Sequence, residues 1–405
     1  MKEKGDRMIS IAILGFGTVG SGVAEVLERN RKKIRDAVGC DVTVKYVLDK
    51  RDLSDTAYAS LAVTDIDVIL NDPEVSIVCE MLGGTQPAYD YSMAALRAGK
   101  NVVTSNKEVV ARFGVSLLKT AQEMGVSYLY EASVGGGIPV LHAMDDSLKG
   151  CEIRRIDGIL NGTTNYILTR MHDCKSSFED ALDEARRLGY AEANPTADIS
   201  GADACRKICI LSALAWGELV PGESVPCEGI TEITADDNEF AILCDGVLKL
   251  VATAKKSEEG LQLSVSPCVV MNENPLASAK GVFNAVKFDA GDLGDVMFYG
   301  MGAGKFPTAS AVISDIMAIV RKSSNRRDVV FSEYGGTVPA KEDFSDAYCL
   351  AVTADTKVLL ERIPTLVVLG EAGDTKYVLC ENVTVGELMK TLDGIPVLKC
   401  MRAIV

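Results

Sequence analysis

The 405-residue sequence has only two histidines, and its twelve cysteines include no CxxC pair. Structural zinc sites and disulfide frameworks need Cys and His residues at regular spacing, so neither kind of site is expected. Singly scattered cysteines are typical of reduced thiols, and we therefore expect a cytoplasmic protein.

Positive charge and long apolar runs are also scarce. The net charge is -15, and no run of Lys and Arg exceeds three residues, so binding to nucleic acid is not expected. No apolar run reaches the ~18 residues that a membrane span needs. Lys2, Lys4 and Arg7 before ISIAILGFG resemble the start of a secretory signal, but glycines soon interrupt the apolar run, which favours a first β-strand. A soluble protein without membrane contact is expected.

Short apolar runs alternate with longer amphipathic segments over roughly the first 140 residues. Strands are predicted at ISIAIL, VTVKYVL, DVIL, VSIVCEML, NVVTS and VSYLYEA, with helices between most of them. This order indicates βαβ units and a parallel, doubly wound sheet, so the fold class is α/β in this part of the chain. The length allows two or three domains.

The pattern changes beyond Pro139. IRRIDGILNG and LQLSVSPCVVM are strand-like, and the residues from Thr164 to about Lys255 are interpreted mainly as helices, which predicts an α+β second domain. FPTASAVISDIMAIVRK predicts an amphipathic helix, and SSNRRD a linker. From about Asp346 to Val405 the order βαββαβ predicts a small module with its own core.

GFGTVG, from Gly15 to Gly20, is a GxGxxG motif after a strand and at the start of a helix. Its glycines permit a tight turn and let the backbone approach a pyrophosphate at the helix N-terminus. A glycine-rich turn without a ligand is the alternative. In VLDKRD, at the end of the second strand, Asp49 could accept the ribose hydroxyl of NAD, whereas Lys50 and Arg51 could neutralise the 2′-phosphate of NADP. The choice between the two cofactors stays open.

Polar residues and glycines follow two further strands of this sheet. Ser105, Asn106 and Lys107 lie between a strand and a helix, where ligands of open parallel sheets bind. A lysine at a helix start opposes the helix dipole, which favours a functional role for Lys107 over that of a surface residue. Gly83 and Gly84 hold the equivalent place after the preceding strand and suit close approach of a nicotinamide or ribose.

EASVGGGIPV, residues 131–140, carries three consecutive glycines after a strand. Such a loop exposes main-chain carbonyls that could bind a hard cation, with Glu131 supplying a carboxylate. A flexible turn between domains is the alternative.

EANPTADISGADACRK crowds charge directly before the apolar run ICILSALAWG. Asp203 and Lys207 are four residues apart and share one helix face, so a surface ion pair is one explanation. A capping box of Ser200 and Asp203 is another. Because the apolar helix should be buried, its first turn should lie at the floor of a cleft, where ion pairs are candidates for chemistry.

Five motifs, in order, resemble the homoserine dehydrogenase family. The longest is ARRLGYAEANPTADISGADACRK, and the others are SNK, EASVGGGIP, NGTTNYIL and GMGAGKFPTA. The resemblance covers roughly residues 8–325. It implies reversible interconversion of L-homoserine and L-aspartate 4-semialdehyde with NADP or NAD, in threonine, methionine and isoleucine biosynthesis.

The resemblance also implies a domain plan. A Rossmann-type NAD(P)-binding domain would comprise residues 1–140, with about 300–325 returning to it. A catalytic and dimerisation domain would cover 141–299, followed by a linker at 326–345 and an ACT-like domain at 346–405.

Roles for site residues follow from the same resemblance. Lys207 would be the acid/base at the reacting oxygen, with Lys107 a second catalytic lysine near the nicotinamide. The substrate would be held by Glu192, Asp203 and Asp198, with Glu192 suited to its ammonium group. The cofactor would be lined by Gly15, Phe16, Gly17, Thr18, Val19, Gly20, Arg51, Thr104, Lys107 and Gly304. A monovalent cation, Na+ or K+, would be bound by Glu131 and the carbonyls of Val134, Gly136 and Ile138.

The segment 346–405 resembles an ACT domain, a module that often senses threonine. TADTKVLLERI lacks the D-x-PG turn that such modules place after their first strand, which puts a threonine effector in doubt. We expect a degenerate ACT-like module used in subunit contacts, and hence a homodimer or homotetramer.

Two other functions are alternatives to homoserine dehydrogenase. Aspartate-semialdehyde dehydrogenase would use a nucleophilic cysteine with a histidine, but Cys79 and Cys151 have no recognisable pairing with His142 or His172. A non-catalytic Rossmann sensor with an ACT-like tail belongs to a different class. Turnover of homoserine with either cofactor would separate an enzyme from a sensor.

Overall fold

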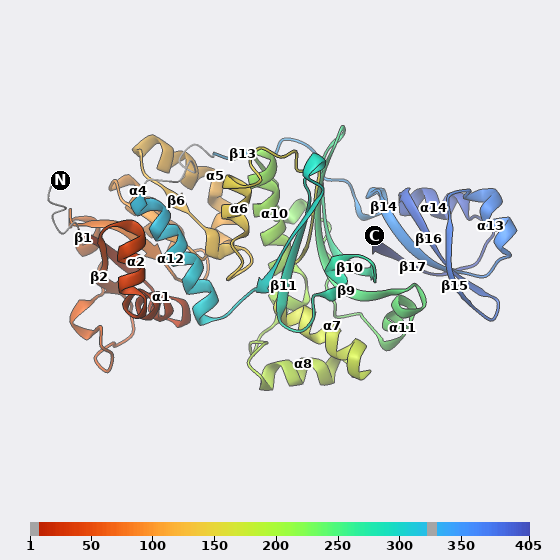
Figure 1. The fold of residues 1–405 in the computed structure, drawn as a ribbon, viewed down its shortest axis with the longest axis horizontal. Helices are drawn as coiled ribbons and strands as arrows, with labels where there is room; N and C mark the ends of the chain where they lie inside the picture. The colour runs from red at the N-terminus through yellow and green to blue at the C-terminus, as the bar shows by residue number, and fades with distance from the viewer. Residues whose placement is uncertain (1–7, 322–329) are drawn as a thin grey trace. The chain divides into compact units, whose positions relative to one another are not determined.

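The computed structural model describes residues 8–321 and 330–405 (Figure 1). Contacts divide the chain into two units. Unit 1 comprises Met1–Gly150, Cys209–Pro221 and Gly300–Tyr334, and unit 2 comprises Cys151–Ile208, Gly222–Tyr299 and Gly335–Val405. The predicted linker SSNRRD and the charged residues Lys2, Lys4 and Arg7 lie outside the described residues.

Unit 1 is built on a six-stranded sheet in the order β3-β2-β1-β4-β5-β6. All its strand pairs are parallel, and the order reverses at β1, which confirms the predicted doubly wound α/β sheet. The strands are β1 (Met8–Leu14), β2 (Asp41–Leu48), β3 (Ala62–Val63), β4 (Val75–Glu80), β5 (Asn101–Thr104) and β6 (Tyr128–Leu129).

Helices cover this sheet. They are α1 (Thr18–Arg29), α2 (Arg31–Val38), α3 (Ile66–Leu70), α4 (Ala88–Arg97), α5 (Lys107–Met124), α6 (Val140–Asp146) and α12 (Lys305–Arg321). Helix α12 lies beside α1 although almost 280 residues separate them in sequence (Figure 1). Ile313 and Ile316 of α12 join Ile13 and Val23 in the core. A short parallel pair, β8 (Glu218–Leu219) and β13 (Ser332–Glu333), completes unit 1.

The strand predicted at DVIL is wrong, because these residues lie in helix α3. The Asp65 side chain caps that helix by accepting a hydrogen bond from the Asp67 N–H, at 2.9 Å. Four apolar residues are too short a run for periodicity to separate a strand from a helix.

Unit 2 contains a nine-stranded mixed sheet in the order β12-β11-β7-β9-β10-β17-β14-β16-β15. Its strands are β7 (Arg155–Ile159), β9 (Gly246–Ser257), β10 (Gly260–Met271), β11 (Phe283–Asp289), β12 (Asp295–Met301), β14 (Asp346–Val352), β15 (Val367–Ala372), β16 (Thr375–Val383) and β17 (Val397–Ile404). Its helices are α7 (Gly162–Cys174), α8 (Phe178–Arg187), α9 (Thr196–Ile199), α10 (Ala202–Trp216, which ends in unit 1), α11 (Ala235–Leu243), α13 (Thr356–Arg362) and α14 (Val385–Thr391). The predicted α+β character is confirmed.

The helical interpretation of Thr164 to about Lys255 is right as far as α11 and wrong from Gly246 onward. Strand β9 pairs antiparallel with β10 along its whole length. Most of its residues are buried on both faces of the sheet, so its sequence lacks the alternation of polar and apolar residues that marks a half-exposed strand.

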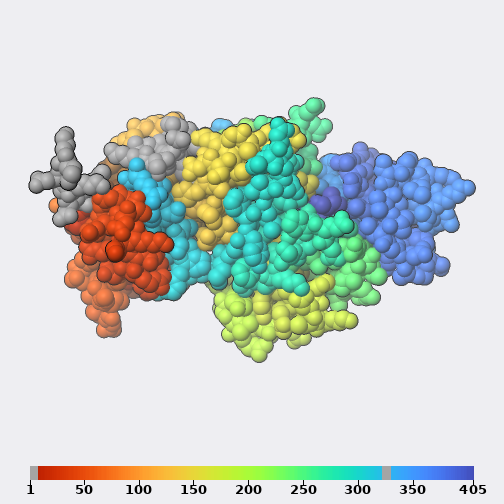
Figure 2. Space-filling model, viewed as in Figure 1, coloured from red at the N-terminus to blue at the C-terminus, as the bar shows by residue number. Residues whose placement is uncertain are grey.

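The C-terminal segment has the predicted order, β14-α13-β15-β16-α14-β17, and its own apolar core, which includes Leu350, Leu359, Val378 and Leu388. Its strands nevertheless continue the sheet of unit 2, because β17 pairs with β10 in parallel. Figure 2 shows these blue residues in direct contact with the green residues of the same unit. The module and the strands before it therefore form one sheet.

Membrane insertion was not expected from the sequence. Within residues 8–321 and 330–405, no helix is both long enough and apolar enough to cross a membrane.

Candidate active site

The glycine-rich turn joins β1 to α1. Gly15 has a φ of +88°, and its N–H donates to the Leu48 carbonyl at 2.7 Å. A Cβ added at Gly20 would lie 2.0 Å from the Gly15 carbonyl oxygen, whereas a Cβ at Gly17 would meet nothing within 4 Å. The turn thus packs tightly between Gly15 and Gly20, whereas the space next to Gly17, at the N-terminus of α1, is free. That geometry fits the pyrophosphate of a dinucleotide.

Asp49 lies just after the end of β2 and is engaged through both carboxylate oxygens. It accepts hydrogen bonds from the Phe16 N–H at 2.7 Å and from the Arg51 N–H, Nε and Nη2 at 2.9, 3.0 and 2.7 Å. The Arg51 guanidinium is the main cause that holds the pKa of Asp49 well below its usual range. The side chain of Arg51 remains 58% exposed. Asp49 therefore anchors an exposed arginine at the end of this strand.

A cavity of about 630 Å³ lies next to this turn, lined by Phe16, Ser21, Thr56 and Tyr58 among other residues. The rings of Phe16 and Tyr58 are 5.0 Å apart. Flat apolar side chains beside a phosphate-binding turn could receive the adenosine half of a dinucleotide.

A buried network links the loops that follow β4 and β5. The Glu80 carboxylate accepts hydrogen bonds from the Thr104 hydroxyl and the Leu82 N–H, both at 2.7 Å. The Asn106 side chain donates to the carbonyls of Leu82 and Gly84 at 3.3 and 2.7 Å. The Thr104 hydroxyl thus donates its hydrogen bond to a protein group. These hydrogen bonds hold the two loops together at the carboxyl edge of the sheet.

Glu80 gives the free energy of unfolding a pH dependence. Burial raises the pKa of this carboxyl from 4.5 to about 7 in the folded chain. Between these two values the folded chain keeps a proton that the unfolded chain has lost, so stability falls as the pH rises through this window, by up to about 3 kcal/mol. Glu80→Gln should remove this component. Urea unfolding of both proteins across the window measures it, and identical pH profiles would contradict the assignment.

The other predicted cofactor residues also belong to unit 1. Lys107 is the first residue of α5 and half-buried, directly after Asn106, which caps the helix by accepting from the Val109 N–H. Thr18 and Val19 open α1, and Gly304, with a φ of +119°, directly precedes α12.

The glycines of the 131–140 loop are required by its shape. Gly135 and Gly136 have φ values of +73° and +55°, and a Cβ at Gly136 would lie 2.4 Å from the Gly302 carbonyl. Glu131 is buried, as are Val134 and Ile138. The loop is therefore tightly folded against neighbouring backbone rather than a loose turn.

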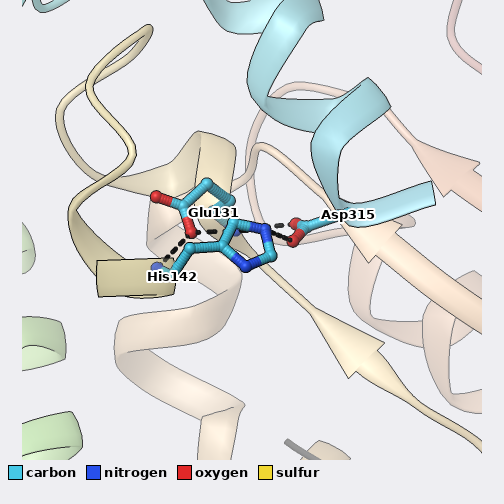
Figure 3. A group of neighbouring side chains, drawn as sticks. All are labelled: Glu131, His142 and Asp315. Carbon is cyan, nitrogen blue, oxygen red and sulfur yellow. Dashed lines mark hydrogen bonds and ion pairs between the residues drawn. The ribbon is translucent and has the colours of Figure 1, made fainter. Parts of the chain in front are cut away.

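Glu131 lies in a cluster with His142 and Asp315 (Figure 3). Its carboxylate accepts from the Leu141 and His142 N–H groups at 3.0 and 2.6 Å, and its own N–H donates to Asp315 at 2.8 Å. The His142 Nε2 lies 3.1 Å from an Asp315 carboxylate oxygen and 3.7 Å from one of Glu131. One potential ligand atom from each residue falls within 4.8 Å of the others. No role for His142 or Asp315 was predicted from the sequence.

The charged residues before the apolar helix form a second cluster, in unit 2. Lys207 and Asp203 are buried, and their Nζ and Oδ2 atoms are 2.6 Å apart, so the predicted i,i+4 pair is present. Lys207 also donates to the Leu160 carbonyl at 2.6 Å. The Asn161 amide donates to Asp198 at 2.7 Å and to Asp203 at 2.9 Å. Asn161, for which no role was predicted, thus bridges two of the predicted residues, Asp198 and Asp203.

The predicted capping box of Ser200 and Asp203 is not formed. Helix α10 begins at Ala202, and Ser200 ends the preceding helix α9, so Ser200 does not cap α10. Glu192 is exposed between α8 and α9, and within the described part of the chain no hydrogen bond joins it to the Lys207 cluster.

Models of known protein families match residues in both units of the chain. The family model for homoserine dehydrogenase matches residues 139–317, and the one for the homoserine dehydrogenase NAD binding domain matches residues 15–131. The homoserine dehydrogenase of Synechocystis is 43% identical over 77% of this chain and 73% of its own, and that of Bacillus subtilis is 40% identical over 78% and 73%.

Solved structures agree with these relatives. A homoserine dehydrogenase from Thiobacillus denitrificans matches with a TM-score of 0.86 and 32% identity, over 98% of both chains. A hyperthermophilic archaeal homoserine dehydrogenase in complex with NADPH matches with a TM-score of 0.68 and 28% identity, over 79% of this chain and 99% of its own. Sequence motifs, fold and relatives agree, and the chain belongs to the homoserine dehydrogenase family.

Proposed function

We propose that the chain interconverts L-homoserine and L-aspartate 4-semialdehyde, with Lys207 as the group that exchanges a proton with the reacting oxygen. The observation that carries this proposal is the buried Lys207 ammonium, which Asp203 and the Leu160 carbonyl hold in one place. A general acid or base must be positioned before its pKa matters.

The chemistry divides between cofactor and protein. When bound, NAD(P) supplies the hydride acceptor for the hydroxyl-bearing carbon. The neutral amine of Lys207 takes the hydroxyl proton in the oxidising direction and becomes the ammonium, which returns the proton in the reducing direction. Asp203 stabilises the charged form of Lys207. The Asn161 amide holds Asp203 and Asp198 in place by donating a hydrogen bond to each carboxylate. Burial of this group keeps competing water away from the transferred proton.

The remaining site residues receive the roles implied by the family. Asp198, Asp203 and Glu192 hold the substrate, with Glu192 facing its ammonium group once bound. Lys107, at the carboxyl edge of the sheet in unit 1, is the second catalytic lysine near the nicotinamide. We propose a cytoplasmic enzyme on the basis of its scattered cysteines.

The direct test is an assay with L-homoserine and either NAD+ or NADP+, followed by the absorbance of the reduced nicotinamide. Turnover with one of the cofactors supports the proposal. Cofactor binding without turnover would favour the sensor interpretation instead.

Arg51 favours NADP as the preferred cofactor. Its carboxylate anchor, Asp49, already accepts four hydrogen bonds and is poorly placed to accept a ribose hydroxyl. An exposed, oriented guanidinium suits a 2′-phosphate.

Arg51→Ala should therefore raise the KM for NADP+ at least about tenfold, the loss expected for one charge-assisted contact, and leave the KM for NAD+ within about twofold. Steady-state kinetics with both cofactors measure the effect. Arg31→Ala, at another exposed arginine of unit 1, is the control, and equal losses with both cofactors would contradict the proposal.

A monovalent cation, Na+ or K+, is proposed at the 131–140 loop. Glu131 offers a buried carboxylate, and the buried residues Val134, Gly136 and Ile138 add main-chain carbonyls, so the donor set consists of hard oxygen atoms. When bound, the cation would supply positive charge that fixes the loop.

Replacing Na+ and K+ by tetramethylammonium should lower the melting temperature of the protein, and restoring either ion should reverse the change. Glu131→Gln should abolish this response. A response that persists in the variant would place the cation elsewhere.

For the C-terminal module we propose a role in subunit contacts, within a homodimer or homotetramer, rather than as a threonine sensor. The absence of a D-x-PG turn after β14 supports this, because the chain there reads TADTK. The module is also continuous with the sheet of unit 2, which suits a structural role.

A further inference from the structure

The main-chain carbonyl of Leu160 accepts two buried hydrogen bonds. One comes from the Lys207 Nζ at 2.6 Å, and the other comes from the side-chain amide of Asn284 at 2.9 Å. A carbonyl oxygen has two lone pairs, so it can accept both bonds at once. Asn284 and Lys207 do not bond to each other here, but they share the same oxygen atom. The Leu160 carbonyl therefore connects Asn284 to the candidate acid/base.

Asn284 meets this carbonyl where the pairing of two strands stops. Antiparallel pairing between β7 and β11 ends at Ile159 and Ala285, so Asn284 and Leu160 would be the next pair. At that position the Asn284 side chain supplies the hydrogen bond that a main-chain N–H supplies further along the ladder. The side chain thus fixes the orientation of the first carbonyl beyond the end of β7.

The backbone that carries Asn284 is itself held in place. Asn165 of α7 is buried, and its amide donates to the carbonyls of Ala279 and Phe283 at 3.1 and 3.0 Å. Phe283 is the first residue of β11 and directly precedes Asn284. These bonds hold the start of the strand against α7, so the Asn284 amide reaches the Leu160 carbonyl from a fixed position.

The oxygen of the Asn284 side chain contributes no such bond. The residue is 0% exposed, and in residues 8–321 and 330–405 no donor meets its Oδ1. The NH2 end must face Leu160, because a carbonyl can only accept. An unsatisfied buried acceptor costs stability, and leucine, which has nearly the same shape, would avoid that cost. The one hydrogen bond to Leu160 is therefore the feature that requires asparagine.

We propose that Asn284 is a positioning residue for proton transfer at Lys207 and acts through the Leu160 carbonyl. The inference rests on the proposed acid/base role of Lys207. Asn284 fixes the carbonyl oxygen, and this oxygen and Asp203 Oδ2 are the acceptors that hold the Lys207 Nζ, each at 2.6 Å. A misplacement of about 1 Å costs on the order of 100-fold in rate. A residue that does not touch the substrate can thus limit turnover.

Asn284→Leu should lower kcat by about 10- to 100-fold and leave the KM for homoserine within about twofold. A weaker bond to the carbonyl stabilises the ammonium less, so the neutral amine forms at lower pH. The rising limb of the pH–rate profile in the oxidising direction should therefore move toward acid by about half a pH unit. The melting temperature should not fall, because the unsatisfied acceptor is removed.

Asn274→Leu is the matched control in the same unit. Asn274 is also buried and donates to a main-chain carbonyl, that of Val405, at 2.7 Å, but its oxygen accepts from the Leu276 N–H at 3.0 Å. This variant should lower the melting temperature and keep the kcat and the pH profile. If Asn284→Leu does not fold, Asn284→Ala removes the same donor without added bulk and gives the same kinetic readouts.

NMR of lysine labelled with ¹³C at Cε tests the contact without turnover. The Lys207 signal is identified by its absence in Lys207→Met, and in Asn284→Leu its titration should move toward acid by the same half unit. Absence of turnover in the unchanged chain would refute the proposed function, whereas the lysine titration would still test Asn284. An unchanged titration, or an unchanged kcat and pH profile, in a folded Asn284 variant would overturn the inference.

Discussion

Replacing Lys207 by methionine should lower kcat by about 10²–10⁴-fold, the usual contribution of a general acid or base. Methionine keeps the length of the side chain but cannot exchange a proton. The buried Asp203 would then lose the ammonium group 2.6 Å away, so we also expect a lower melting temperature. The glycine-rich turn keeps its own hydrogen bonds, such as the one from the Gly15 N–H to the Leu48 carbonyl, so the dissociation constant of the cofactor should stay within about twofold.

Lys280→Met is the matched control, since Lys280 is an exposed lysine of the same unit that pairs with Asp173. Its kcat should equal that of the unchanged chain. Fluorescence titration with the reduced cofactor and steady-state kinetics separate binding from turnover. A Lys207→Met variant that folds and retains more than about a tenth of the activity would rule out the acid/base role, because that loss is smaller than such catalysis supplies.

The second large effect is expected at the glycine-rich turn. In Gly20→Ala the new Cβ would have to sit 2.0 Å from the Gly15 carbonyl oxygen, which is backbone and cannot rotate away. The turn must therefore open. We expect a loss of stability of about 1–3 kcal/mol, as for other overpacked sites, together with at least a tenfold rise in the cofactor KM.

Gly17→Ala provides a comparison within the same motif. A Cβ there meets nothing within 4 Å, and Gly17 has a φ of -74°, which alanine adopts freely. The variant should keep its melting temperature but bind the cofactor more weakly, because the methyl group would enter the space left for the pyrophosphate. Thermal unfolding and cofactor titration of both variants test this difference. Equal melting temperatures for the two would show that the turn is not as tightly closed as described.

Local patterns allowed most of unit 1 to be predicted, and tertiary burial explains where prediction failed. The glycine motif and the alternation of strands and helices are local signals, and so is the spacing of Asp203 and Lys207 on one helix face. Strand β9 was missed because both its faces are buried, which removes the two-residue period. Helix α3 was mistaken for a strand because only four apolar residues mark it.

The parts of the candidate site that were missed depend on contacts between distant residues. Asn161 lies 42 residues before Asp203, and Glu131 lies 184 residues before Asp315. No spacing rule relates such residues, because their meeting depends on how whole helices and strands pack. The NGTTNYIL motif marked Asn161 as part of the family pattern without indicating that its amide bridges two carboxylates.

The pairing of β17 with β10 has a consequence for attempts to study the catalytic part alone. Residues Val269 and Val270 of β10 pair with Ala403 and Ile404, close to the end of the sequence. Cutting the chain before β14 would turn β10 into an open sheet edge flanked by buried apolar side chains. Such an edge invites pairing with another molecule. A shortened chain should therefore aggregate. In the whole chain, the last strand covers the edge of β10 and prevents its pairing with strands of other molecules.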